Sequence, residues 1–213
     1  MLELIIPSLL QTVYMVFFST VFSLLLGFPM GVLLVITEKG GIWEKPTLYR
    51  ILDGTINVLR SFPFLILMVL LFPLSRLIVG KTIGTTATIV PLSIAAAPFV
   101  ARVIESSLKE VDKGVIEFGQ SIGATVPQII FKILIPEAMP SLIMGITLTI
   151  VNIIGYSAMA GAIGGGGLGD LAIRYGLYRF QTDIMVVAVV VIILLVQGVQ
   201  FLGNKLASKI NKK

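Results

Sequence analysis

The sequence contains no cysteine and no histidine, and each absence removes a class of chemistry. Without cysteine the chain has no disulfide, no thiol nucleophile and no thiolate ligand for zinc. Without histidine it has no imidazole to serve as a general base near neutral pH. Carboxylates alone can still bind a metal ion, but no acidic cluster in the sequence indicates such a site. We therefore expect no catalytic residue, no metal and no cofactor in this chain.

Charged residues are also scarce. They make up 13% of the 213 residues, whereas hydrophobic residues make up 56%. Soluble domains have roughly 25% charged and about 45–50% apolar residues. The apolar residues here form long blocks rather than stripes, which predicts an all-α integral membrane protein. The net charge of +5 comes from basic residues that flank these blocks, so we interpret it as a membrane-topology signal and expect no nucleic-acid partner.

Five hydrophobic stretches are candidates for membrane spans, because a helix needs about 20 mostly apolar residues to cross a bilayer. Together they form one predicted domain over residues 8–204. The predicted spans are about 8–37, 56–75, 82–104, 138–163 and 184–204.

The distribution of basic residues predicts the orientation of these spans. Twelve of the 16 lysine and arginine residues lie in segments 38–60, 102–137 and 204–213. Cytoplasmic loops carry an excess of such residues. We therefore expect the N-terminus outside and the C-terminus inside, which agrees with an odd number of spans.

The segment 105–137, between the third and fourth spans, is too polar to cross the membrane and too apolar for a solvated tail. It is typical of short amphipathic helices packed on other structure. Gly123 is placed to end one helix and Pro127 to begin the next. Ser106 and Ser107 are candidates for a helix start.

Two nucleotide-binding patterns were considered. No G-x-x-x-x-G-K-[ST] sequence is present, so no P-loop is expected and ATP would have to be hydrolysed by a partner. Residues 164–169 read GGGGLG and match G-x-G-x-x-G. They follow a membrane span rather than a strand, so we interpret them as a tightly turning outside loop.

The fourth span carries the best candidates for a transport path. Thr149, Asn152, Tyr156 and Met159 are spaced to share one helical face. We interpret them as path-lining residues, with the flexible thioether of Met159 forming a constriction. The alternative is that these polar groups bond neighbouring helices. The centres of the spans carry no ionisable side chain, which weighs against an ion-coupled carrier.

Within the segment 105–137 the residues follow the pattern E-x-G-x3-G-x9-I-x-I-P, from Glu117 to Pro136. This resembles the E-A-A-x3-G-x9-I-x-L-P signature of binding-protein-dependent ABC importer permeases. Phe118 departs from the first alanine of the signature. The resemblance implies that the segment docks into a separate ATPase subunit, through residues Glu117, Gly119, Gly123, Ala124, Ile133 and Pro136.

Three longer stretches, residues 60–68, 98–112 and 156–176, resemble the methionine-importing permeases of that superfamily. The resemblance implies a homodimer in the lipid of the bacterial cytoplasmic membrane. It implies two copies of a cytoplasmic ATPase subunit, an extracytoplasmic substrate-binding lipoprotein and an amino-acid substrate, D- or L-methionine. The chain itself is then a multi-pass permease and not an enzyme.

Other functions stay open at this point. A permease for another small solute, such as an osmoprotectant, would share the coupling pattern. An ATP-independent channel or secondary carrier would not need it. An intramembrane enzyme is disfavoured, because a Ser–Lys pair is the remaining catalytic option and no lysine lies near the centre of a span.

Overall fold

The computed structural model describes residues 2–210, and all its regular elements in this range are helices. The elements are α1 (Leu2–Thr37), α2 (Pro46–Ser61), α3 (Phe64–Leu70), α4 (Phe72–Val79), α5 (Thr85–Lys109), α6 (Lys113–Ser121), α7 (Val126–Ile129), the π-helix η1 (Ile130–Leu134), α8 (Ile135–Glu137), α9 (Met139–Gly161), α10 (Gly167–Leu171), the π-helix η2 (Ala172–Leu177) and α11 (Thr182–Ile210).

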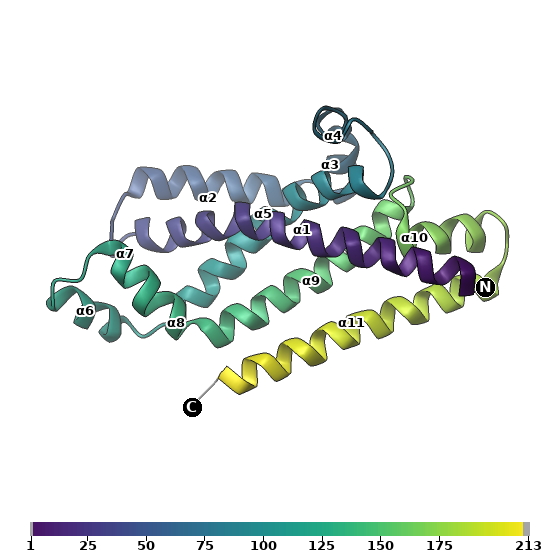
Figure 1. Ribbon diagram of the computed structural model, residues 1–213. Helices are drawn as coiled ribbons and strands as arrows, with labels where there is room; N and C mark the ends of the chain where they lie inside the picture. Colours follow the sequence, from purple (N-terminus) through teal and green to yellow (C-terminus); the bar gives the residue numbers. More distant parts are fainter. Residues whose placement is uncertain (1, 211–213) are drawn as a thin grey trace.

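Four helices, α1, α5, α9 and α11, are long and apolar enough to cross a membrane. Figure 1 shows them running lengthwise along one bundle, with α6, α7 and α8 gathered at one end and α10 at the other. The first residues of α1 and the last residues of α11 lie toward opposite ends of this bundle (Figure 1). The all-helical membrane fold predicted from the sequence is confirmed at this level.

The second predicted span, 56–75, is not a single helix. Helix α2 ends at Ser61, and α3 begins at Phe64 after a bend of 100°. The cause is Pro63, because a proline disfavours the helical conformation of the residue before it. Phe62 is accordingly extended, with ψ of 129°. The bent pair α2–α3 counts as a fifth span if the two helices are taken together.

The other helices differ from the predicted spans at their ends. Helix α1 begins six residues earlier than expected, and α11 continues to Ile210. Helix α5 continues to Lys109, so the first residues of the segment 105–137 belong to this helix. Ser106 and Ser107 therefore lie inside α5 and begin no helix.

Glycines bring α1 and α5 into direct backbone contact. A Cβ atom added to Gly31 would lie 2.6 Å from the carbonyl oxygen of Ala101. Gly27, one turn earlier, faces the carbonyl of Ala97 in the same way. Small residues spaced four apart allow this close approach, which maximises van der Waals contact between helices in a membrane.

Two further helix crossings use a glycine on one side. Gly145 of α9 faces Val103 of α5, and Gly203 of α11 faces Thr147 of α9. Helix α9 is therefore held between α5 and α11. Its outward face, which includes Met144 and Leu148, lies open in the single chain.

The contact at Gly31 generates a stability prediction. We expect Gly31→Leu to destabilise the protein by about 1–3 kcal/mol, because the backbone carbonyl of Ala101 cannot move aside as a side chain can. The matched control is Gly54→Ala in the middle of α2, where no atom lies within 4 Å of the added Cβ. Thermal unfolding in detergent should show a lower Tm for the first variant and an unchanged or slightly higher Tm for the second. Equal values would contradict the proposed contact.

Candidate functional site

The spacing of the glycines in the segment 105–137 has a direct structural cause. Helix α6 begins at Asp112, whose carboxylate accepts a hydrogen bond from the Gly114 amide at 2.7 Å. It ends in a Schellman motif, in which Ala124 N–H donates to Gly119 and Gly123 N–H donates to Gln120. Gly123 has the positive φ of 77° that this motif requires.

Gly119 also forms the contact between the two halves of the segment. It is the buried residue of α6, and a Cβ atom added to it would lie 2.6 Å from Cδ1 of Ile133. A larger residue at position 119 would therefore have to displace the end of the Ile133 side chain or move α6 away from η1. The predicted residues Gly119, Ala124 and Ile133 are brought together here, whereas Glu117 and Pro136 are exposed.

The second half of the segment is continuous with α9. Pro136 has no backbone N–H to bond one turn back, and the turn before it is the wider π-helix η1. Ile135 N–H donates to Ile130 instead, an i→i−5 bond. Helices α7, η1, α8 and α9 then follow one another with a single turn residue, Ala138, between α8 and α9.

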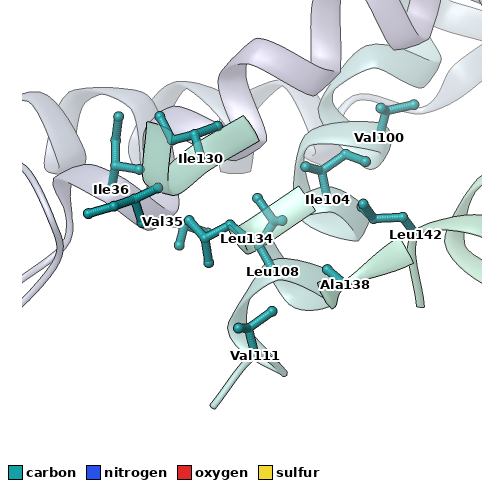
Figure 2. Packing of buried hydrophobic residues seen from close by; sticks show 11 residues of the cluster. Val35, Ile36, Val100, Ile104, Leu108, Val111, Ile130, Leu134, Ala138 and Leu142 are labelled. Atoms are coloured by element: carbon teal, nitrogen blue, oxygen red, sulfur yellow. The ribbon is translucent and has the colours of Figure 1, made fainter. Parts of the chain in front are cut away.

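A hydrophobic cluster anchors this segment in the bundle. Figure 2 shows side chains of α1, α5 and η1 meeting around Leu134, which is fully buried. Val35 and Ile36 come from the end of α1, and Ile104 and Leu108 from the end of α5. Burying one such side chain contributes about 1.5–3 kcal/mol. The segment is thus part of the core rather than a loose loop.

A neighbouring face of α6 presents large apolar side chains. Val115, Phe118 and Ile122 are exposed, with 64% of Phe118 and 66% of Ile122 accessible. Their spacing of three and four residues places them on one face of the helix and its C-cap. Sequence reasoning selected Glu117, which at 100° per residue lies on a neighbouring face, and missed these three apolar residues, because Phe118 departs from the family pattern.

A chain of charged residues links α1, α2 and α5 near the same end. Lys109 contacts Glu38 at 2.7 Å and Glu105 at 2.8 Å. Arg102 contacts Glu105 at 2.7 Å and also pairs with Asp53 of α2. The Glu105 side chain is 8% exposed, so two cations offset the cost of burying its carboxylate.

The four residues predicted to line a path in the fourth span differ in their exposure. Thr149 is fully buried and donates its hydroxyl to the Gly145 carbonyl at 3.0 Å. Asn152 and Tyr156 are half-buried, and Met159 is 51% exposed on the open face of α9. At 100° per residue Thr149 is well removed from the middle of that face, which explains its burial against the bundle.

The glycine-rich stretch 164–169 contains the end of the connection from α9 and the first residues of α10. Its amides at Gly167 and Leu168 donate to the side chains of Gln11 and Thr12 of α1, both at 2.9 Å. Gly164, Gly166 and Gly167 all have positive φ, which other residues rarely adopt. Because protein groups occupy two of its amide donors, the loop is a tight turn and not a phosphate cradle.

No group of three or more acidic residues within 2–210 is placed to hold a metal ion. The geometry therefore offers two functional surfaces: the exposed apolar face of α6 at one end, and the open face of α9 along the bundle. These two faces belong to separate helices, which are linked by the packing of Gly119 against Ile133 of η1 and by the run of helices from η1 to α9. Such an arrangement suits a membrane protein that receives a movement at one end and changes a path between its spans.

The chain belongs to the family described as binding-protein-dependent transport system inner membrane component, whose profile matches residues 24–212. The description names an inner membrane component of a transport system that depends on a binding protein.

Two relatives define the similarity more closely. The chain is 50% identical over 211 residues to the probable D-methionine transport system permease protein MetI of Vibrio cholerae, covering 99% of this chain and 94% of that protein. It is 45% identical over 181 residues to the methionine import system permease protein MetP of Bacillus subtilis, covering 85% and 82%.

Solved structures agree with this relationship. A chain of the MetNI methionine ABC transporter, solved in inward-facing conformations, matches with a TM-score of 0.97 and 40% identity over 100% of this chain and 98% of that one. A chain of an amino acid ABC transporter crystallised with histidines matches with a TM-score of 0.79 at 19% identity over 97% and 94% of the two chains, and therefore shares the fold.

The charged chain generates the second prediction. We expect Arg102→Ala to lower stability by a substantial part of the roughly 3–5 kcal/mol that breaking a buried pair costs, reduced because 20% of the arginine side chain is exposed. The control is Arg174→Ala, which removes the 57% exposed partner of Asp170 and should cost less than about 1 kcal/mol. Detergent thermal unfolding of both variants measures the difference, and equal losses would contradict a special role for Arg102.

Proposed function

We propose that this chain is the membrane-spanning permease subunit of an ATP-driven methionine importer in the bacterial cytoplasmic membrane. The relatives named for methionine transport support the substrate, since they match nearly the full chain at 45–50% identity. The observation that carries the mechanism is the run of helices α7, η1, α8 and α9, against which α6 packs through Gly119. The chain itself hydrolyses no ATP.

The working unit is a homodimer with two cytoplasmic ATPase subunits and an extracytoplasmic substrate-binding protein. The permease domain is residues 8–204, with the coupling segment 105–137 inside it. The N-terminus lies outside and the C-terminus inside. Basic residues near the α6 end of the bundle, such as Lys39 and Lys113, support this orientation, as do the first residues of α1 and the last residues of α11, which lie toward opposite ends in Figure 1.

The exposed face of α6 is the docking surface for the ATPase. Phe118 and Ile122 supply an apolar centre, and Glu117 lies beside them. Buried apolar anchors with polar neighbours are what a stable protein interface needs. Gly119, Gly123 and Ala124 act from inside by holding α6 against η1.

The open face of α9 lines the translocation path together with the same face of the second copy. Asn152, Tyr156 and Met159 lie on or beside it, and Met159 is the constriction. Thr149 contributes from behind, through its hydrogen bond to the α9 backbone. Movement of α6 on the ATPase is carried through η1 and α8 to α9, so the path opens alternately to the two sides.

Transport by the complete system is the first test. Vesicles containing this chain, the ATPase and the binding protein should accumulate radiolabelled methionine when ATP is supplied on the side of the membrane where the ATPase is bound. Omission of the ATPase, the binding protein or ATP should each abolish uptake. Uptake by this chain alone would indicate a channel or secondary carrier. Uptake of another solute, such as an osmoprotectant, in place of methionine would support the assignment as a permease but contradict the assignment of methionine as its substrate.

The contact inside the coupling segment generates a second test. We expect Gly119→Leu to reduce co-purification of the ATPase and to abolish uptake, because the leucine displaces α6 from Ile133. Helices α1, α5 and α11 should stay folded, so the yield in membranes should not change. The control is Gly198→Leu in α11, where no atom lies within 4 Å of an added Cβ. Normal uptake by the Gly119 variant would contradict the coupling role; Gly123→Leu, strained by its φ of 77°, should act in the same direction.

A further inference from the structure

A small cavity of about 160 Å³ lies where α2 ends and α3 begins, against α5 and α9. One arginine and several aromatic rings line it. Its principal lining residues are Arg60, Phe62, Phe64, Ala95, Phe99 and Tyr156.

The cavity lies at the middle of the bundle. Helix α5 has 25 residues, and Ala95 and Phe99 are on either side of its midpoint. With a rise of 1.5 Å per residue, each end of α5 is roughly 15–20 Å away. Arg60 falls in the overlap of the predicted span 56–75 and the basic segment 38–60, and its place in this cavity puts it at the depth of the middle of α5. Importers of several folds bind their substrates near this depth.

Arg60 makes no ion pair with any acidic residue between positions 2 and 210. Arg102, also within the bundle, is paired with Asp53 and Glu105. An arginine at membrane depth is costly and is normally paired or functional. Arg60 also offsets the dipole at the end of α2, but a lysine would serve that purpose equally. Arg60, an exposed residue of the single chain, thus lines the cavity and has no ion-pair partner within residues 2–210.

The aromatic walls define what else the cavity accepts. Phe64 and Tyr156 are stacked, with ring centroids 4.5 Å apart and an interplanar angle of 4°. Phe99 adds a further ring from α5. Aromatic rings make favourable contacts with thioether sulfur and with aliphatic groups. Tyr156 is also one of the path residues, so the cavity adjoins the open face of α9.

We propose that this cavity is a mid-membrane substrate site, in which Arg60 binds the carboxylate of the passing amino acid and the rings of Phe64, Phe99 and Tyr156 hold its apolar side chain. The guanidinium can donate two parallel hydrogen bonds to a carboxylate. The proposal rests on the proposed function and adds a site within the permease.

The test is equilibrium binding of L-methionine to the purified permease–ATPase complex without the binding protein. The wild-type complex should bind methionine at least about tenfold more tightly than methionine amide, whose carboxylate is replaced by a neutral group. Arg60→Gln should lose about tenfold in methionine affinity and bind the two ligands equally. Arg60→Lys should lie between the two, because it keeps the charge but not the planar geometry.

The control variant is Arg50→Gln, which removes another cation from the same helix. The Arg50 side chain donates a hydrogen bond to the Pro46 carbonyl at 3.4 Å. It should bind methionine as the wild type does. Equal affinity of the wild type for methionine and its amide, absence of saturable binding, or unchanged binding in Arg60→Gln would each overturn the site. The first two comparisons need no variant. If the complete system still takes up methionine in those cases, the proposed function stands without this site; if the wild type takes up no methionine, the substrate assignment itself fails.

Discussion

The contact on which the rest of this structure depends is the burial of Leu134 and its neighbours between the ends of α1 and α5 (Figure 2). Without it, the segment between α5 and α9 would be a solvent-exposed loop with an unfixed position. With it, α6 is tied to η1 through Gly119, and η1 is tied to the bundle through Leu134. A force applied to the exposed face of α6 therefore reaches the membrane helices instead of being lost in loop motion.

Glycine contacts and buried ion pairs join the helices in two different parts of this bundle. Inside a membrane, helices gain little from apolar burial, because lipid is equally apolar, so close backbone approach at Gly27 and Gly31 supplies the contact. Near the α6 end, the charged chain from Glu38 to Asp53 joins three helices where water is closer. The two devices hold α1 to α5 along its length and α2 to α5 at one end. Helix α9 is left free to present one face.

Local patterns in the sequence predicted much of this arrangement. Four of the five spans were found from hydropathy, and the turn at Gly123 from its position in the motif. The broken second span was missed because a hydropathy average over many residues is hardly changed by Pro63. The helix, in contrast, ends at this proline. The pairing of Asp53 with Arg102 joins residues 49 positions apart, and no periodicity indicates it. Thr149 satisfied the helical spacing, but burial depends on which neighbours surround the helix, and spacing does not contain that information.

Helix α9 connects both ends of the molecule mechanically. At one end it continues into α8 and η1. At the other, its last turn is packed against α10 so closely that Gly161 and Gly169 admit no side chain, and α10 is bonded to α1 through Gln11 and Thr12. A segment fixed so tightly at both ends cannot bend locally without breaking these contacts. Movement of α9 as one body with its neighbours would keep these contacts, which supports the proposed mechanism in which the path opens alternately to the two sides.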